Sequence, residues 1–122
     1  MRVLVTGTSN PVGRAIVDIL VRQGHQVRAF GGEESDLQGL AQGPGQLMWY
    51  PGDVAIGGQI EPALSERQAL VHAANLDAAH AGGKAGRQAL ALQVERGTKY
   101  ARYAAEREQV DDFIVVTPAA PE

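Results

Sequence analysis

The chain has 122 residues, of which 44% are hydrophobic and 20% charged, enough for the core of one domain but not of two. Its net charge of -3 at pH 7 argues against nucleic acid as a partner, and the absence of cysteine excludes a disulfide scaffold or a thiolate metal site. The first apolar run is too short for a signal peptide or a membrane span, so we expect one cytoplasmic domain over residues 1–122, with no membrane partner.

The first predicted element is an apolar strand over residues 2–6, which runs into a glycine-bounded turn and then a helix. A turn that feeds a helix N-terminus aims unpaired backbone N–H groups and the positive end of the helix dipole at one point, which suits the pyrophosphate of a dinucleotide. Gly7 would allow a sharp turn off the strand, and Gly13 would allow a close contact between strand and helix.

Asn10 occupies the middle position of the usual Gly-x-x-Gly-x-x-Gly spacing between Gly7 and Gly13. Asparagine tolerates left-handed backbone angles and is a favoured helix N-cap, and Pro11 suits the first helical position. Two interpretations stay open: Asn10 only caps the helix, or it caps the helix and also contacts a bound cofactor. A side chain at this position would make a bulkier floor under the pyrophosphate and weaken its binding.

Short apolar runs rich in Val, Ile and Leu alternate with helical patterns along the chain, which is typical of a parallel sheet covered on both faces. Further strands are predicted over residues 25–30, 46–50, 69–74 and 113–117. Glycines interrupt the segment between the second and third strands, and a short helix is expected over residues 60–67. Residues 78–109 are expected to begin with a mobile glycine-rich part and to continue as one alanine-rich helix. The first helix carries a continuous apolar stripe of Val12, Ala15, Ile16, Ile19 and Leu20.

Right-handed crossovers would place the five strands in the order 3-2-1-4-5, giving a doubly wound, Rossmann-like α/β sheet with helices on both faces. A ligand crevice is expected where the order reverses, between strands one and four. The histidines His25, His72 and His80 lie in different elements without the spacing of metal ligands, so no metal site is expected. His72 lies in an apolar strand and is expected to be a packed core residue.

Four stretches of the chain resemble the short-chain dehydrogenase/reductase family, and in particular its extended branch of NAD-dependent epimerases, dehydratases and related reductases. The sequence Arg-Val-Leu-Val-Thr-Gly at residues 2–7, with Gly13, matches the phosphate loop of the family, and Gly-Asp-Val at residues 52–54 matches its signature after strand three. Leu-Val-His-Ala-Ala at residues 70–74 matches the apolar strand that ends in small residues. Residues 95–98, 104–105 and 110–116 match the following helix and the fifth strand, so the resemblance covers nearly the whole chain.

The resemblance implies an NAD(P)-binding domain in which Asp53 hydrogen-bonds the adenine amino group and small residues after strand four let the cofactor lie close. Two alternatives stay open, because Asp53 also suits a plain turn, and the alanines after strand four also fit a packed layer. Gly97 and Thr98 are expected to close a helix-packing contact. The residues expected to bind the cofactor are Gly7, Thr8, Ser9, Asn10, Pro11, Val12, Gly13, Arg14, Asp53, Val54, Ala73, Ala74 and Asn75.

The choice between NAD and NADP in the family usually depends on an acid at the end of strand two, which accepts hydrogen bonds from the ribose and repels a 2′-phosphate. Gly31 stands at that position, and the first acid after it is Glu33. Arg14 and Arg28 would bring positive charge near a phosphate, although Arg28 equally suits a solvated strand position. These features slightly favour NADP over NAD, while Glu33 and Glu34 argue the other way.

Catalysis in the family uses a Tyr-x-x-x-Lys pair on the helix after strand five, and the chain ends at Glu122 before that helix could begin. Tyr103 and Arg107 imitate the spacing, but they precede strand five, and arginine cannot replace the lysine, so Tyr103 is expected to be a helix surface or packing residue. Thr117 keeps part of the serine pattern at the end of strand five, while Pro118 replaces the hydroxyl-bearing residue. We therefore predict no catalytic residue in this chain.

Three hypotheses follow from this pattern. The chain is part of an enzyme of hydride transfer or epimerisation that a longer chain or a partner completes, or it is a non-catalytic cofactor-sensing or protein-interaction module, or its fold no longer binds a cofactor. Strand five would be an exposed apolar edge, so we also predict a homodimer or another protein association near that strand or the preceding helix.

Overall fold

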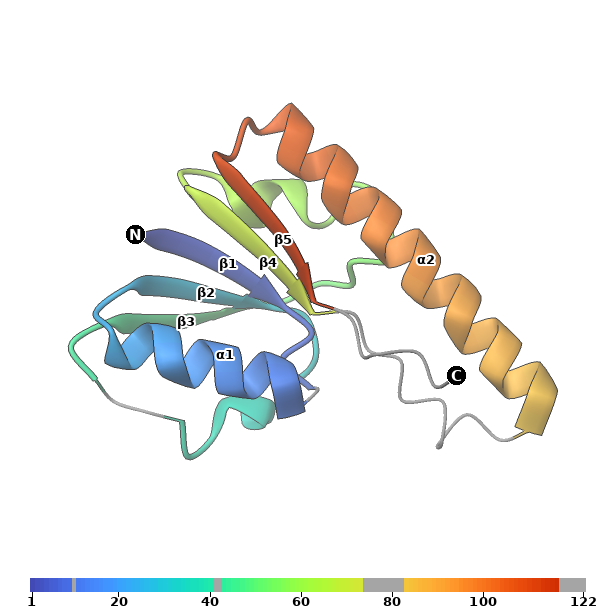
Figure 1. Ribbon diagram of the computed structural model, residues 1–122, viewed down its shortest axis with the longest axis horizontal. Coiled ribbons are helices and arrows are strands. Elements are labelled where there is room, and N and C mark those ends of the chain that lie inside the picture. The colour runs from blue at the N-terminus through green and yellow to red at the C-terminus, as the bar shows by residue number, and fades with distance from the viewer. Residues whose placement is uncertain (10, 41–42, 74–82, 117–122) are drawn as a thin grey trace.

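The computed structural model describes residues 1–9, 11–40, 43–73 and 83–116. It contains one parallel sheet of five strands in the order β3-β2-β1-β4-β5 (Figure 1). The predicted order is therefore confirmed, and it reverses between β1 and β4 as a doubly wound sheet requires. The strands are β1 (Arg2–Thr6), β2 (Gln26–Phe30), β3 (Gln46–Tyr50), β4 (Ala69–Ala73) and β5 (Asp112–Val116).

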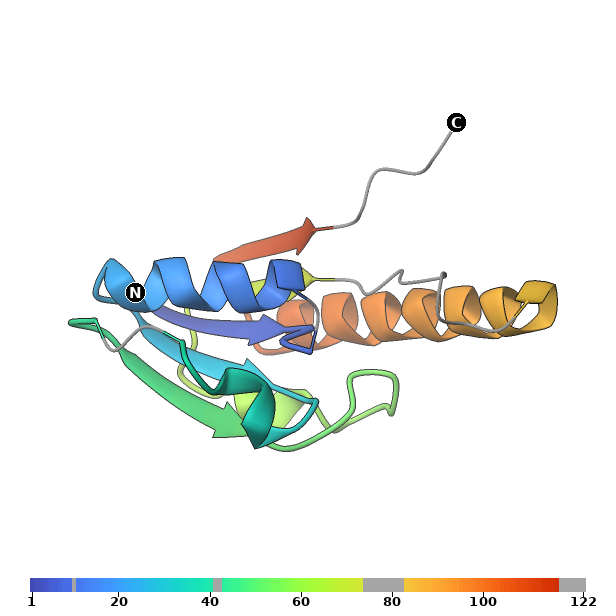
Figure 2. The same cartoon turned by 90° about the horizontal axis from the view of Figure 1, so that it is seen from below.

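Two helices cover opposite faces of this sheet (Figure 2). Helix α1 (Pro11–Arg22) connects β1 to β2, and helix α2 (Gly83–Arg107) precedes β5. Two short 3-10 helices, η1 (Glu34–Leu37) and η2 (Glu61–Leu64), follow β2 and β3, respectively. The first turns of α2 extend past the carboxyl ends of the strands, as both views show (Figures 1 and 2).

The core consists of two clusters, one on each face of the sheet, because alternate residues of a strand point to opposite faces. On the α2 face, Leu4, Phe30 and Leu70 pack against η2 and against three alanines of α2. On the α1 face, Val17 and Val21 pack on strand valines. The buried members are Leu4, Phe30, Ile60, Ala63, Leu64, Leu70, Ala101, Ala104 and Ala105 on the α2 face, and Val3, Val5, Val17, Val21, Val27, Ala69 and Val71 on the α1 face.

The rotation of α1 differs from the one that its apolar stripe predicts. Its buried residues are Gly13, Val17 and Val21, at i, i+4 and i+8, whereas Val12 is 47% exposed and Ile19 is 53% exposed. Gly13 lies against the turn after β1, and this contact turns the line of Gly13, Val17 and Val21 toward the sheet. The predicted stripe therefore lies along the edge of the helix contact, and only its members Ile16 and Leu20 pack partly on the core.

The helices of the second half also differ from the sequence-based bounds. The helix expected over residues 60–67 is the 3-10 helix η2, and its Pro62 leaves one backbone N–H fewer for a longer helix. Helix α2 already begins at Gly83 and includes Gly86, where the sequence predicts a mobile beginning. The intervening lysine and alanine are good helix formers and offset part of the cost of the glycines, about 1 kcal/mol each. The predicted strand ends at residues 74 and 117 lie outside the described residues.

Strand β5 forms one edge of the sheet, and its side chains are only partly covered. Ile114 on the α1 face is 50% exposed, and Val115 on the α2 face is 37% exposed. Phe113 is partly buried and packs against the α2-face cluster. Within the described residues, no helix has both the length and the apolar character needed to cross a membrane.

Candidate functional site

The turn after β1 lies in direct contact with both β4 and α1. Gly7 has a φ of 76°, in the left-handed region that favours glycine. A Cβ atom on Gly7 would collide with the carbonyl oxygen of Ala73 at the end of β4, and one on Gly13 would collide with the carbonyl oxygen of Gly7. Gly7 and Gly13 therefore meet Ala73, which is far away in the sequence, where the strand order reverses.

Two hydroxyl-bearing residues follow Gly7 in this turn. Thr8 is 1% exposed, and its Oγ1 atom has no hydrogen-bond partner among the described residues. Ser9 is exposed, and its side chain lies beside the position that a Cβ on Gly32 would take, at 3.6 Å. This turn fits the binding of a phosphate group. Gly7 and Gly13 carry no side chains, and the buried hydroxyl of Thr8 has no partner among the described residues.

The segment after β2 brings a carboxylate to the same edge of the sheet. Gly31 and Gly32 have φ values of 88° and 64°, and the chain then enters η1. The Asp36 carboxylate accepts a hydrogen bond from the backbone N–H of Glu33 at 2.9 Å. Its Oδ2 atom lies 2.7 Å from the position of a Cβ on Gly32, the residue that also neighbours Ser9. An acid therefore lies at the end of β2, although the residue directly after the strand is glycine.

Asp53 lies in the loop after β3, and its contacts there are local. Its Oδ1 accepts a hydrogen bond from the N–H of Ala55 at 2.9 Å, and its own N–H donates to Oε1 of Gln59 at 2.8 Å. Asp53 therefore stabilises a turn, which was one of the two alternatives that the sequence left open. No partner of the other carboxylate oxygen is found among the described residues, and the side chain is exposed.

The loop after β3 is fixed to its neighbours on two sides. A Cβ on Gly31 would lie 3.2 Å from the carbonyl oxygen of Gly52, and Nε1 of Trp49 donates to the carbonyl oxygen of Gly31 at 3.2 Å. On the other side, Val54 packs against α2, where a Cβ on Gly97 would lie 3.1 Å from its Cγ1. The predicted packing role of Gly97 is confirmed, and the ends of β2 and β3 and helix α2 form one connected surface.

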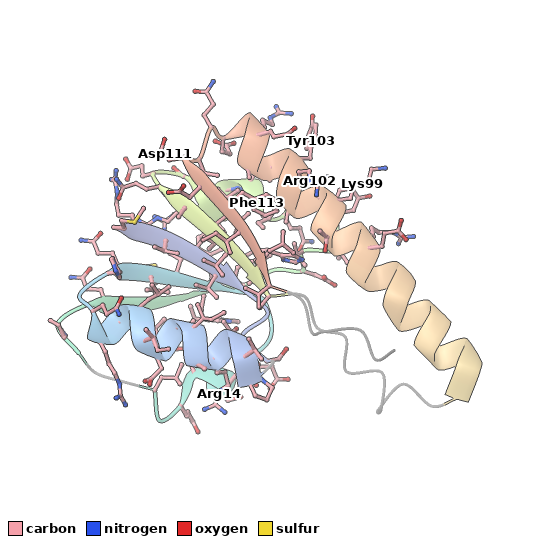
Figure 3. All side chains as sticks on the ribbon, viewed as in Figure 1. Arg14, Lys99, Arg102, Tyr103, Asp111 and Phe113 are labelled. Atoms are coloured by element: carbon pink, nitrogen blue, oxygen red, sulfur yellow. The ribbon has the colours of Figure 1, made fainter. Side chains whose placement is uncertain are left out.

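The two arginines considered for phosphate binding have different surroundings. Arg14 begins on the first turn of α1 and reaches toward the segment after η1, where its Nη2 donates to the carbonyl oxygen of Gln38 at 3.2 Å (Figure 3). Arg28 donates from Nη1 to the carbonyl oxygens of Ala63 and Ser65 at 3.0 and 2.8 Å. Arg28 is therefore bound to η2. It neither contacts the glycine turn nor extends freely into solvent, as the two sequence interpretations expected.

His72 is a buried polar residue that joins three elements. Its Nδ1 lies 2.6 Å from Oγ1 of Thr6 on β1, and its Nε2 lies 3.1 Å from Oγ1 of Thr98 on α2. The side chain is 3% exposed, and burial lowers the pKa of its imidazole below the usual value. The predicted core role of His72 is confirmed, and Thr98 takes part in the same contact.

Tyr103 points away from the sheet on the outer side of α2, together with Arg102 (Figure 3). It is 54% exposed, and its hydroxyl accepts a hydrogen bond from Nη1 of Arg107 at 3.4 Å. Tyr103 and Arg107, which imitate the Tyr-x-x-x-Lys spacing, are therefore a surface pair near the end of α2, as predicted. Within the described part of the chain, no three residues among His, Cys, Asp and Glu are grouped so that they could hold a metal ion.

The remaining predicted binding residues are placed as follows. Pro11 and Val12 are exposed on the first turn of α1, close in sequence to the glycine contact. Asn10, Ala74 and Asn75 lie outside the described residues. The residues Gly7, Thr8, Ser9, Gly13 and Ala73 thus share one edge of the sheet with the loop that holds Asp53 and Val54.

A family model matches most of the chain. Residues 7–120 match the model described as NAD(P)H-binding. The chain belongs to this NAD(P)H-binding family. No match to a curated protein was found.

Solved structures share the fold of the NAD(P)H-binding chain at low sequence identity. The oxidoreductase ylbE from Lactococcus lactis is 19% identical, with a TM-score of 0.71 over 94% of this chain and 47% of its own. The Bordetella bronchiseptica enzyme WbmG, in complex with NAD and UDP, is 24% identical, with a TM-score of 0.67 over 94% of this chain and 36% of its own. An alcohol dehydrogenase from the archaeon Thermococcus sibiricus, complexed with 5-hydroxy-NADP, is 18% identical, with a TM-score of 0.64 over 93% of this chain and 56% of its own.

These similarities show a Rossmann-like fold, and the chain spans between 36% and 56% of the length of the three neighbours. The family model and the shared fold thus confirm the predicted NAD(P)-binding, Rossmann-like domain.

Sequence reasoning missed Asp36 as a residue of this edge. The signal was present in the pair of glycines after β2, because two positive φ values let the chain turn back on itself. The hydrogen bonds between Glu33 and Asp36 are those of a capping box, and they hold the Asp36 carboxylate against the turn. The sequence therefore allowed a prediction of Asp36 as a capping residue, but its proximity to Ser9 depends on the three-dimensional fold.

Proposed function

We propose that this chain binds NAD(H) or NADP(H) at the carboxyl edge of its sheet, with the pyrophosphate at the turn of residues 7–14. The contacts of Gly7 with Ala73 and of Gly13 with Gly7 carry this proposal, because they leave no room for side chains at these two positions of a turn that leads into the N-terminus of α1, where unpaired backbone N–H groups suit a phosphate. Asp53 would contact the adenine, and Val54, Ala73, Ala74 and Asn75 would line the remainder of the cofactor. The cofactors bound by WbmG and by the alcohol dehydrogenase support the same class of ligand.

The catalytic role proposed for the chain is limited to holding the cofactor. The Tyr-x-x-x-Lys pair implied by the family resemblance is not found in residues 1–122, and Tyr103 with Arg107 lies on the exposed side of α2. Hydride transfer or epimerisation would then need further residues from a longer chain or a partner. The alternative is a non-catalytic cofactor-sensing or interaction module, which would bind the cofactor without turnover.

Asp36 is the residue that we propose to influence the choice between NAD and NADP. A carboxylate beside Gly32 and Ser9 would accept hydrogen bonds from the ribose and repel a 2′-phosphate. Arg14 reaches the segment after η1, where it donates to the carbonyl oxygen of Gln38, and its positive charge would favour the 2′-phosphate. The sequence slightly favours NADP, whereas the position of Asp36 favours NAD, so a direct comparison of the two cofactors is needed.

A homodimer is proposed at β5, within a protein that acts in the cytoplasm. The unpaired edge of β5, with Ile114 half exposed, gives an apolar surface that a second copy would cover. Sedimentation analysis of the purified chain tests this, and a Ile114→Lys variant is expected to shift the protein toward the monomer. A monomer at all concentrations of the unsubstituted chain would contradict the proposal.

Thermal unfolding with NAD, NADH, NADP and NADPH in turn tests cofactor binding. A cofactor present at about one hundred times its dissociation constant should add roughly 2.7 kcal/mol to the free energy of unfolding. A Ser9→Asp variant places a negative charge beside the proposed pyrophosphate and is expected to abolish the shift. The matched control is Ser65→Asp, an equally exposed position in the loop after η2.

The outcomes separate the hypotheses. A shift that Ser9→Asp removes and Ser65→Asp preserves would support the proposed site. Replacement of Asp36 by asparagine, which keeps an acceptor for the Glu33 N–H, should then raise the affinity for NADPH relative to NADH, and Glu34→Gln is its control. The absence of any shift with all four cofactors at millimolar concentration would contradict cofactor binding by this chain.

A further inference from the structure

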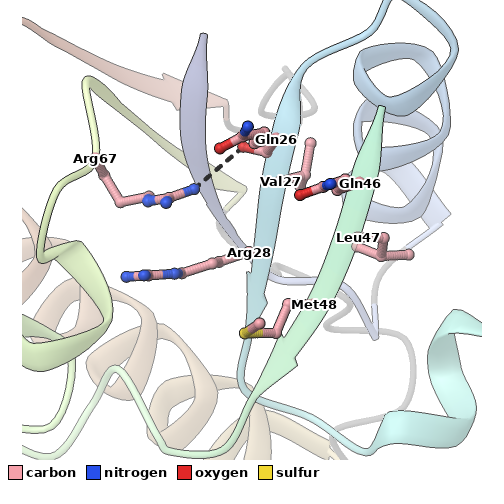
Figure 4. Close-up of a pocket in the computed structure, with 7 residues that line it drawn as sticks. All are labelled: Gln26, Val27, Arg28, Gln46, Leu47, Met48 and Arg67. Atoms are coloured by element: carbon pink, nitrogen blue, oxygen red, sulfur yellow. Dashed lines mark hydrogen bonds between the residues drawn. The ribbon is translucent and has the colours of Figure 1, made fainter. Parts of the chain in front are cut away.

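A pocket of about 420 Å³ lies over the first halves of β2 and β3, on the face of the sheet that carries η2 (Figure 4). Its lining includes Gln26, Arg28, Gln46, Met48 and Arg67. The candidate cofactor site lies at the carboxyl ends of the same strands, so the two sites occupy opposite ends of the sheet. The volume falls within the range of about 300–1,000 Å³ that is usual for small-molecule sites.

The pocket follows from the lack of a long crossover helix between β3 and β4. The connection between these strands contains the four-residue helix η2 in place of a full crossover helix, and η2 packs with Leu4 of β1, Phe30 of β2 and Leu70 of β4. Met48 remains 60% exposed, although it pairs with Arg28 in the middle of both strands. An apolar side chain and two guanidinium groups therefore border the same open space (Figure 4).

Both arginines are held in place by backbone carbonyl groups. Nη1 of Arg28 donates to Ala63 and Ser65, and Nη1 of Arg67 donates to the carbonyl oxygen of Gln26 at 3.2 Å. A carbonyl group fixes the direction of a guanidinium but does not neutralise its charge. Among the residues that the structure describes, the ion pair within 4.0 Å is that of Arg22 with Asp18 on α1, so neither pocket arginine has a carboxylate partner there.

The positive charges at this end of the sheet act on one another. Burial, and after it the charges of Arg28 and Arg2, lower the pKa of the Arg67 guanidinium, and Glu66 opposes this shift. Arg2 lies at the start of β1, beside Gln26 in the sheet register. The guanidinium groups stay charged at neutral pH, so three like charges gather in a chain whose net charge is -3.

We propose that this pocket binds a phosphate-like oxyanion, either free or carried on a small molecule, between Arg28 and Arg67. Guanidinium groups match the oxygens of phosphate with paired hydrogen bonds, and a dianion relieves the repulsion between the arginines. Since carbonyl groups already orient both side chains, little rotamer freedom is lost on binding. An organic group attached to the phosphate would lie against Met48.

Nuclear magnetic resonance of the isotope-labelled chain during a titration with inorganic phosphate tests this site, with sodium chloride at matched ionic strength as reference. Saturable shifts are expected at residues 26–28, 46–48 and 67. The location separates this site from the glycine turn, because phosphate bound there would shift residues 7–14. Shifts confined to residues 7–14, or shifts that chloride reproduces, would overturn the proposal and leave the proposed cofactor site untouched.

Two variants of equal charge change sharpen the test. Arg67→Gln should weaken phosphate binding about tenfold or more, as expected for the loss of a charge-assisted pair of hydrogen bonds. Arg102→Gln removes an exposed charge on α2 and should change the affinity less than twofold. Equal weakening by both variants would indicate a general charge effect and overturn the site. If Arg67→Gln does not fold, Arg67→Lys keeps the charge but loses the planar fork and should still weaken binding.

A second titration with phenyl phosphate distinguishes the two sources of the oxyanion. Tighter binding of phenyl phosphate than of inorganic phosphate, reduced by Met48→Ala, would assign a phosphorylated small molecule to the pocket. Equal affinities for both, each lowered by Arg67→Gln, would assign free phosphate. No saturable binding of either compound at residues 26–28 and 46–48 would overturn the proposal.

Discussion

The part of the sheet beneath α2 and the part beside α1 and β5 are closed to different degrees. On the α2 face, the alanines of α2 let the helix approach closely, and Leu4, Leu70 and Ile60 are each 0% exposed. On the α1 face, Val17 is equally buried, but Ile114 on β5 is 50% exposed, and Ile19 on the helix is 53% exposed. Small residues of α2 thus bury the strands directly beneath that helix, because closeness of approach decides how much strand surface is covered, whereas Met48 on the same face stays 60% exposed.

The largest expected effect compares a residue under α2 with one on the open edge. Leu70→Ala should lower the free energy of unfolding by about 2–5 kcal/mol, because it leaves a cavity in the α2-face cluster. Ile114→Ala, on the neighbouring strand, should cost about 1 kcal/mol or less, because half of that side chain is in water. Denaturant unfolding of both variants measures the difference, and equal losses would show that the α1 face is covered in solution.

The second effect compares the two sides of α1. Gly13→Val should destabilise the protein by roughly 1–3 kcal/mol or more, since its side chain would collide with the carbonyl oxygen of Gly7. Ala15→Val, on the exposed side of the same helix, should cost less than about 1 kcal/mol, the difference in helix propensity. The same unfolding experiment tests this pair. A tolerant Gly13 would mean that another rotation of α1, with the predicted stripe buried, is accessible.

The third effect concerns the polar contact under α2. Burial lowers the pKa of His72 below 6.5, so the unfolded chain takes up a proton before the folded chain does as the pH falls. The free energy of unfolding should therefore decrease as the pH falls below about 6.5, by at most about 1.4 kcal/mol per pH unit, until folded His72 is protonated.

Denaturant unfolding across this pH range measures the effect of His72. A His72→Gln variant should lose this part of the pH dependence, whereas His25→Gln, directly before β2, should keep it. An unchanged pH dependence in His72→Gln would contradict the burial of a neutral imidazole.

The smallest effect lies on the solvent side of α1. Arg22 forms an ion pair with Asp18 at 3.2 Å, and the arginine side chain is 69% exposed. Arg22→Gln should cost about 0.3–0.5 kcal/mol, and 1 M salt should remove most of the difference. A loss of more than about 1 kcal/mol would contradict the exposure of this side of α1 to solvent.

The sheet and its order were predictable, because five apolar runs with right-handed crossovers allow few arrangements. The glycine turn was also predictable, because the spacing of Gly7 and Gly13 after an apolar strand is typical of a phosphate loop. The burial of His72 followed from its apolar neighbours in β4. These features depend on residues close together in the sequence.

The other features depend on three-dimensional contacts that the spacing of residues along the sequence does not show. The apolar stripe of α1 did not show which of its edges the sheet covers, because the contact of Gly13 with Gly7 sets the rotation. Arg28 was considered for a phosphate, but its bonds to Ala63 and Ser65 require a loop that comes 35 residues later or more. Asp36 reaches the end of β2 only through two glycines with positive φ values.

Trp49 gives the carboxyl edge a built-in optical reporter. It is the single tryptophan of the chain, and its hydrogen bond to Gly31 fixes the indole beside the segment that holds Gly32 and Asp36. Tryptophan emission overlaps the absorption of a reduced nicotinamide but not of an oxidised one. Quenching of the intrinsic fluorescence would thus distinguish the redox states of a bound dinucleotide without any label.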